Sequence, residues 1–244
     1  MKLVVGTRGS NLALVQTNWV VDQLKKENPG VEFEVKIIKT KGDLIKDLPL
    51  DKIGDKGLFV KEIEKSLLDG EIDMAVHSMK DMPSYLPEGL KFAHSPKRED
   101  PRDALIFKEG YKSLDDLPQG ARIGTGSKRR KYQLLKHRPD LEIVPIRGNI
   151  ETRIKKIETE KLDGVVLAAS GLRRAGLDDK IDYYIPTDIM LPAPAQGILA
   201  LEIREDDKET EKIIDSIKDN ITKVQIDAER GFLIGVNGSC HIPM

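Results

Sequence analysis

Apolar residues recur along this chain of 244 residues at two spacings, one typical of strands and one typical of helices. Short apolar runs bounded by glycine, proline or charged residues predict strands at 3–6, 31–39, 72–76, 89–93, 121–124, 141–146, 163–168 and 198–203. Helical spacing predicts helices after the N-cap Ser10 and at 58–68, 207–219 and 224–236. Strands that alternate with helices favour an α/β fold.

One predicted strand leads directly into a group of reactive side chains. The apolar run 72–76 is followed by His77, Lys80 and Asp81, before Pro83 stops regular structure. In open α/β sheets, ligands bind beyond the carboxyl ends of the strands, where loops converge on a rigid support. Taken alone, this pattern also fits an ordinary strand-to-loop junction with solvated polar residues.

Similar junctions recur at other strand ends. Three later strands end in small residues followed by arginine, within the segments 125–130, 147–149 and 169–174, and the first strand leads into Arg8 and Ser10 at the start of a helix. Small residues leave backbone N–H groups accessible, arginine stays charged, and a helix N-terminus attracts anions. Each loop is also what a helix-capping turn requires, but their recurrence favours a polyanionic ligand.

Two charged segments interrupt the pattern of strands and helices. Residues 40–56 form a long stretch interrupted twice by glycine, which we interpret as a lid. Residues 96–103 contain two prolines and six charged residues, and predict a crossover between domains.

Composition and charge narrow the function classes. Hydrophobic residues make up 39% of the chain, enough for sizeable cores, and the net charge of −1 argues against a nucleic-acid binder. Residues 122–156 nevertheless hold eleven lysines and arginines against three acids, which creates a local field that attracts anions. Only Tyr132 is aromatic in that stretch, so RNA bases would find few stacking platforms.

Membrane, metal and disulfide roles find little support. No apolar run approaches the roughly 20 residues that span a bilayer, and the start of the chain lacks a signal-peptide core, so we expect a cytoplasmic protein. The histidines, His77, His94, His137 and His241, show no metal-ligand spacing. Cys240 is the single cysteine, which excludes an internal disulfide and leaves it either inert or chemically special.

A series of motifs runs along essentially the whole chain: Gly6-Thr-Arg-Gly-Ser10, Gly57-Leu-Phe-Val-Lys-Glu62, Ala75-Val-His-Ser-Met-Lys-Asp81, Arg98-Glu-Asp-Pro-Arg-Asp103, Arg147-Gly-Asn149, Gln196-Gly197 and the glycine-cysteine loop around Cys240. A series of this length and order is highly specific. The sequence resembles the porphobilinogen deaminase family, whose members are also called hydroxymethylbilane synthases.

The resemblance implies two α/β domains around a cleft, like those of periplasmic binding proteins, and a third, C-terminal domain that bears the cysteine loop. On this expectation domain 1 comprises residues 1–96 and 198–216, domain 2 comprises 97–197, and 217–244 is a remnant of domain 3. Family members usually continue well past the cysteine. We therefore expect either a truncated piece or a separate chain that supplies the missing C-terminal domain.

The resemblance also implies an activity. The family joins four porphobilinogen molecules head to tail into hydroxymethylbilane, expels ammonia at each step, and extends a covalent dipyrromethane cofactor. By motif position, Cys240 resembles the cysteine that holds this cofactor through a thioether. Loss of ammonia from an aminomethylpyrrole leaves an electrophilic carbon that a thiolate can attack, so a lone cysteine suits this role. Asp81, with Lys80 beside it, matches the family's catalytic aspartate, which stabilises positive charge on the pyrrole nitrogen.

The partners expected from the resemblance are porphobilinogen and the growing oligopyrrole, a polycarboxylate that needs cationic side chains around it. Cofactor contacts are implied at Cys240, Arg8, Ser10, Lys80, Asp81, Thr125, Ser127, Arg129, Arg130, Arg147 and Gly148. Substrate contacts are implied at Arg8, Ser10, Arg147, Arg153, Arg174, Gln196, Lys52, Lys56 and Phe59, the last three in the family's mobile loop region.

Two other interpretations stay open. One is a non-catalytic two-domain receptor for a carboxylate or oxyanion, in which Lys80, Asp81 and Cys240 would be idle. The other is a relative that keeps the fold but cannot mature. Release of ammonia from porphobilinogen separates the enzyme from both. The sequence leaves open whether the cofactor is attached, its oxidation state, and the oligomeric state.

Overall fold

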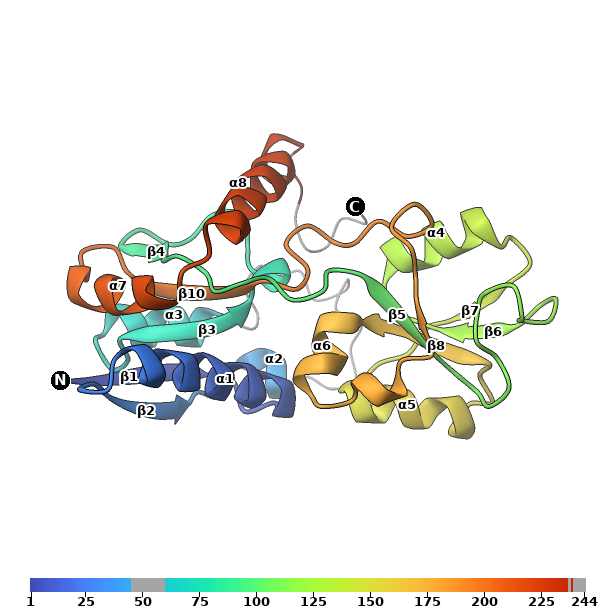
Figure 1. Cartoon of the computed structure of the whole chain (residues 1–244), viewed down its shortest axis with the longest axis horizontal. Coiled ribbons are helices and arrows are strands. Elements are labelled where there is room, and N and C mark those ends of the chain that lie inside the picture. Colours follow the sequence, from blue (N-terminus) through green and yellow to red (C-terminus); the bar gives the residue numbers. More distant parts are fainter. Residues whose placement is uncertain (45–59, 237, 239–244) are drawn as a thin grey trace. The chain divides into compact units, whose positions relative to one another are not determined.

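The computed structural model describes residues 1–44, 60–236 and 238. They form two compact units: one is Met1–Arg98 with the chain from Ile198 through the last helix, and the other is Glu99–Gly197. Each unit holds a mixed sheet of five strands (Figure 1). The predicted α/β class is confirmed. The predicted domain bounds, including a third segment at 217–244, stay predictions.

The first unit carries its sheet in the order β2-β1-β3-β10-β4. Strand β1 pairs in parallel with β2 and β3, whereas β10 pairs antiparallel with β3 and β4. Its elements, with η for a 3-10 helix, are β1 (Lys2–Thr7), α1 (Asn11–Glu27), β2 (Glu32–Ile37), α2 (Lys41–Leu44), α3 (Lys61–Leu68), β3 (Met74–Ser78), η2 (Met79–Asp81), β4 (Leu90–Phe92), β10 (Leu199–Arg204), α7 (Lys208–Ile214), η4 (Asp215–Ile217) and α8 (Asn220–Gly235).

The two faces of this sheet are covered by different helices because side chains alternate along each strand. Leu3 and Val5 of β1 point to one face, where they join a core with Leu24 of α1. Val4 points to the opposite face and packs against a core that contains Ile63 of α3. Both faces of the sheet are therefore covered at β1, and polar side chains follow at the carboxyl end of this strand.

The second unit repeats the same pattern of pairing, in the order β7-β6-β8-β5-β9. Strand β6 pairs in parallel with β7 and β8, and β5 pairs antiparallel with β8 and β9. Helix α4 covers one face and α5 and α6 the other. The elements are β5 (Asp103–Phe107), β6 (Arg122–Gly124), α4 (Lys128–His137), β7 (Glu142–Val144), α5 (Ile150–Thr159), β8 (Gly164–Ala168), α6 (Ala169–Arg174), η3 (Asp178–Lys180) and β9 (Tyr183–Tyr184).

Several element bounds differ from the predictions. The predicted strand 72–76 lies at Met74–Ser78, because β10 pairs with it as far as Ser78. Helix α8 begins at Asn220 rather than 224, because the Asp219 carboxylate accepts a hydrogen bond from the Thr222 amide and caps it. The predicted helix 207–219 divides into α7 and η4. Strands β5 and β9 were not predicted.

The predicted lid, 40–56, falls mostly outside the described residues; its start forms the short helix α2. Within the described ranges, no helix combines the length and the apolar content that crossing a membrane requires.

Candidate active site

Asp81 and Lys80 lie in η2, the single turn that follows β3 directly. Met79 and Met82, on either side of them, are each 1% exposed and anchor the turn in the core. Asp81 is exposed and Lys80 is half-buried. Two buried methionines therefore anchor the turn, while Asp81 is exposed at the carboxyl end of a strand, as predicted.

His77 belongs to β3 rather than to the loop after it, and it is buried. Its Nε2 atom lies 3.0 Å from Oε2 of Glu202 on the neighbouring strand β10. Glu64 of α3 is also buried, and this burial, followed by repulsion from Glu202, raises the pKa of the Glu64 carboxyl to about 7. The strand that carries the Asp81 turn thus rests on a buried group of acids and an imidazole.

Arg8 and Ser10 connect β1 to α1 at the same sheet edge as η2, because β1 and β3 are parallel neighbours. The Ser10 hydroxyl caps α1 by accepting a hydrogen bond from the Ala13 amide at 3.4 Å. The Ser78 hydroxyl donates to the side-chain carbonyl of Gln16 at 3.3 Å, which joins the end of β3 to the same helix. The structure therefore brings Arg8, Ser10, Lys80 and Asp81 to one edge of the first sheet.

The equivalent edge of the second sheet carries the loops after β6 and β7. Ser127 caps α4 through the Arg130 amide, and the buried Thr125 hydroxyl accepts from the Ser127 amide at 3.2 Å. A Cβ atom on Gly126 would lie 2.7 Å from a backbone oxygen, so only glycine fits this loop. Half-buried Arg147 and exposed Gly148 follow β7.

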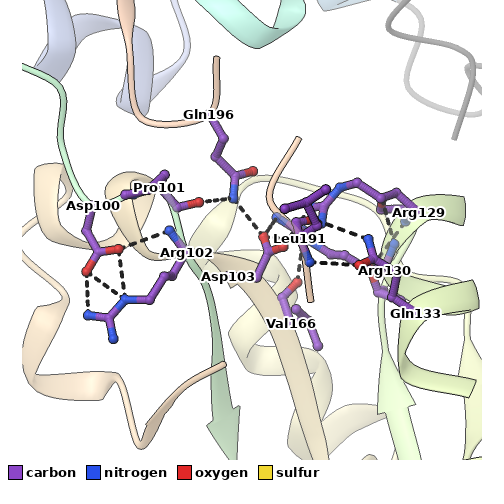
Figure 2. A network of polar contacts seen from close by, with 12 residues as sticks. Asp100, Pro101, Arg102, Asp103, Arg129, Arg130, Gln133, Val166, Leu191 and Gln196 are labelled. Atoms are coloured by element: carbon purple, nitrogen blue, oxygen red, sulfur yellow. Dashed lines mark hydrogen bonds and ion pairs between the residues drawn. The ribbon is translucent and has the colours of Figure 1, made fainter. Parts of the chain in front are cut away.

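Arg129 and Arg130 point inward to a buried carboxylate (Figure 2). Asp103 Oδ2 accepts from Arg129 Nη2 at 2.6 Å, and Oδ1 accepts from Arg130 Nε and Nη2 at 3.0 and 2.8 Å. Arg129 also donates to the Leu191 carbonyl, and Arg130 to the Val166 carbonyl. Burial alone would raise the pKa of the Asp103 carboxyl, but Arg130 and Arg129 outweigh it and hold that pKa below its ordinary value.

The other side chains of this unit that were predicted to contact substrate also form hydrogen bonds within the chain. Gln196 is fully buried and donates to Asp103 Oδ1 at 2.9 Å and to the Pro101 carbonyl at 2.7 Å, as Figure 2 shows. Arg174 donates to the Gly197 carbonyl at 2.7 Å, and burial lowers the pKa of its guanidinium to about 10. Arg153 donates to the Gly148 carbonyl at 2.7 Å. Their roles as ligand contacts stay predictions.

The sequence interpretation did not identify Asp103 or Arg230 as important. Asp103 ends a charged segment, so only the apolar run 104–107 after it could have indicated a strand whose first residue is buried. Arg230 lies on α8 and is 8% exposed, and nothing in its local sequence distinguishes it from a solvated arginine.

Four predicted site residues, Cys240, Lys52, Lys56 and Phe59, lie outside the described residues. In the part of the chain that the structure describes, no group of three or more His, Cys, Asp or Glu side chains is arranged to hold a metal ion.

Comparison with known proteins decides the family. Residues 3–212 match the family model described as "Porphobilinogen deaminase, dipyromethane cofactor binding domain". The chain belongs to the porphobilinogen deaminase family. It is 71% identical over 244 residues to the porphobilinogen deaminase of Clostridioides difficile, an alignment that covers 100% of this chain and 81% of that protein. The porphobilinogen deaminase of Clostridium novyi is 63% identical over 247 residues, which cover 100% of this chain and 82% of that protein.

Solved structures agree on the fold of this porphobilinogen deaminase family member. A probable amino-acid ABC transporter extracellular-binding protein from Bacillus subtilis has a TM-score of 0.52 and 13% identity, with 96% of this chain and 95% of that chain covered. A nutrient binding protein from Burkholderia cenocepacia has a TM-score of 0.50 and 17% identity, with 94% and 97% covered. At such identities the likeness shows a fold of the binding-protein type and nothing about ligands.

The described residues fit the polycarboxylate cofactor that the family model names. The loops before α4 and α5 contain Gly126 and Gly148, where an added Cβ would lie 2.7 Å from atoms of Ile146 and Thr152, so both positions require glycine, which has no side chain to cover its own amide. Such loops can offer N–H groups to carboxylates, and Arg147 stands beside one of them. In the first unit Arg8 and Lys80 supply positive charge at the edge that bears Asp81.

Proposed function

We propose that this chain is a transferase that joins four porphobilinogen molecules head to tail into hydroxymethylbilane and releases ammonia at each step. The observation that carries the proposal is the 71% identity, over the whole chain, to a protein named porphobilinogen deaminase. The position of Asp81, exposed in a turn between the buried Met79 and Met82, supports its assignment as the catalytic carboxylate.

Asp81 acts by charge. Loss of ammonia from an aminomethylpyrrole leaves positive charge on the ring, and a carboxylate fixed beside the pyrrole nitrogen stabilises that charge as it develops. Lys80, in the same turn, binds a carboxylate of the substrate and so orients the ring toward Asp81.

The second unit binds the carboxylates of the oligopyrrole. Thr125, Ser127, Arg147 and Gly148 offer hydroxyl, N–H and guanidinium donors at the carboxyl ends of β6 and β7. Arg129 and Arg130 are also assigned to cofactor binding, in addition to the hydrogen bonds that they donate to Asp103 and to the Leu191 and Val166 carbonyls. Arg153, Arg174 and Gln196 are assigned to substrate binding, as are Lys52, Lys56 and Phe59 outside the described residues.

The dipyrromethane group, held through Cys240, supplies the free pyrrole position to which the first substrate is joined. Arg8 and Ser10 bind its carboxylates at the N-terminus of α1. The proposal includes a cytoplasmic location.

Ammonia release from porphobilinogen tests the activity, and Asp81→Ala tests the assigned role. Removal of a carboxylate aimed at developing charge costs about 3 to 4 kcal/mol of transition-state stabilisation, so we expect turnover to fall at least about a hundredfold. Glu71→Gln is the matched control, because Glu71 is an exposed carboxylate just before β3, at the opposite end from Asp81. Near-normal turnover by Asp81→Ala would remove Asp81 from the mechanism.

The intact mass of the purified chain tests the cofactor separately. We expect added mass equal to one dipyrromethane, which is absent from Cys240→Ser. An unmodified chain that releases no ammonia would favour a maturation-deficient relative or a non-catalytic anion receptor. The likeness to extracellular binding proteins shows the fold alone and does not favour the receptor.

A further inference from the structure

Arg230 is a buried cation that no role has been assigned to. It lies in the C-terminal half of α8, is 8% exposed, and reaches from that helix to the segment that carries Asp81. Burial lowers the pKa of its guanidinium. Burial of a guanidinium is costly unless its N–H groups are satisfied, so the groups that it contacts indicate its purpose.

These contacts lie on both sides of the catalytic turn. Nη2 of Arg230 donates to the Pro83 carbonyl at 2.7 Å and to the Ser84 carbonyl at 3.0 Å. Nη1 lies 3.9 Å from the sulfur of Met79, and the guanidinium stands 5.0 Å from the ring centre of Phe92 on β4. One planar group thus holds the residue before Lys80 and Asp81 and the two residues that follow Met82.

Hydrogen bonds from the backbone and from Ser84 also hold this turn. The Met79 amide donates to the Ile198 carbonyl at 3.0 Å, and the Met82 amide donates to the Met79 carbonyl at 3.1 Å. The Ser84 hydroxyl donates to the Gly238 carbonyl at 2.9 Å, two residues before Cys240 in the sequence. Arg230 therefore lies where the Asp81 turn and the end of α8 are tied together.

We propose that Arg230 is a positioning residue for the reaction: it fixes the 79–84 segment so that the Asp81 carboxylate is held in its productive place. This inference rests on the proposed role of Asp81. The planar fork of a guanidinium can bond two successive carbonyls at once, whereas the ammonium of a lysine is a point charge on a flexible stem. Misplacement of a catalytic group by about 1 Å can cost roughly a hundredfold in rate.

The chain offers a matched control in the adjacent residue. Glu229 binds Arg98 through a bidentate ion pair, with distances of 2.5 and 3.1 Å, and so attaches the same helix to the same unit. Neither bond of that pair involves the 79–84 segment. Glu229→Gln weakens the attachment of α8, and Arg230→Met weakens it and also releases the Asp81 turn.

The experiment is a double-mutant cycle on ammonia release by the full chain, with kcat and KM measured separately. We expect Arg230→Met to lower kcat about 10- to 100-fold, with KM changed less than about threefold. Arg230→Lys should recover part of the lost kcat. Glu229→Gln should keep kcat near the wild-type value. In the Asp81→Ala background, Arg230→Met should cost less than about threefold more, because its effect acts through the missing carboxylate.

Hydrogen exchange supplies a readout independent of activity. The Met79 and Met82 amides should exchange faster in Arg230→Met than in wild type, and should be unchanged in Glu229→Gln. If Arg230→Met fails to fold, the same double-mutant cycle with Arg230→Lys tests the inference in its place.

An additive loss in the double mutant, an equal loss in Glu229→Gln, or wild-type kcat in the Arg230 variants would overturn this inference alone. An inactive wild type, or a fully active Asp81→Ala, would instead overturn the proposed function and this inference with it.

Discussion

Asp103 is the residue whose loss should damage the second unit most. It is 0% exposed, and its two oxygens accept four hydrogen bonds, from Arg129, Arg130 and Gln196. Asp103→Asn keeps the shape of the side chain but removes the only negative charge in this group, and its amide would face guanidinium donors. Removal of one partner from a buried ion pair costs about 3 to 5 kcal/mol, because the remaining charges stay buried and unpaired.

For a chain of this length, such a loss lowers the midpoint of thermal unfolding by roughly 6 to 20 °C. We would measure the loss of unfolding free energy itself by equilibrium urea unfolding with far-UV circular dichroism, since urea does not screen charges as guanidinium does. Asp140→Asn is the control: Asp140 forms an ion pair with Arg138 at 2.8 Å, but both side chains are partly exposed to solvent.

A triple variant tests whether unpaired buried charge causes the stability loss predicted for Asp103→Asn. Asp103→Leu with Arg129→Met and Arg130→Met removes all three charges together, and well-packed apolar replacements of a buried ionic group are often neutral or stabilising. The triple variant should therefore be more stable than Asp103→Asn. If Asp103→Asn loses no more stability than Asp140→Asn, or if the triple variant is the least stable of the set, the account of this network is wrong.

Two further predictions concern stability. In the native state the pKa of the Glu64 carboxyl is raised from its ordinary 4.5 to about 7, so this group stabilises the fold below pH 4.5 and loses that contribution as the pH rises through 7. Urea titrations across this window should show that wild type loses up to about 3 kcal/mol of unfolding free energy relative to Glu64→Gln. Parallel pH curves for the two proteins would refute the raised pKa. Gly197 has a φ of +89°, and a Cβ atom there would lie 2.4 Å from the Glu99 carbonyl oxygen. Gly197→Ala should therefore destabilise the chain by several kcal/mol. The loss should clearly exceed that of Gly176→Ala, where φ is +68° and no atom lies close to the added Cβ.

The sequence predicted the sheets well where apolar runs were continuous. The strand before Asp81 was placed correctly in outline, but its end was not, because His77 looks like a loop residue until its partner Glu202 is known. That partner lies 125 positions away, so no local pattern could have indicated it. The turn that carries Asp81 was itself predicted from its place after a buried strand, which is a local signal.

The strand β5 was missed for a related reason. Asp103 is charged, and a charged residue normally marks the outside of a strand, yet here two arginines from α4 neutralise it. The same arginines were predicted as ligand contacts because they follow a small-residue loop. The sequence shows that they are cations near a helix N-terminus, but the structure was needed to show the carboxylate that they already bind.

Both units have a strand-to-helix loop at equivalent strands, but the side chains in these loops differ. After the strand that stands second in each sheet, β1 or β6, a serine caps the next helix, Ser10 in one unit and Ser127 in the other. After the next parallel strand, β3 or β8, the first unit presents Asp81, whereas the second presents α6 with Arg174 at its end. A reaction that develops positive charge on a polycarboxylate needs both kinds of group, one carboxylate for the charge and many cations for the chain. On the proposed function, the first sheet edge supplies this carboxylate, and both edges supply the cations.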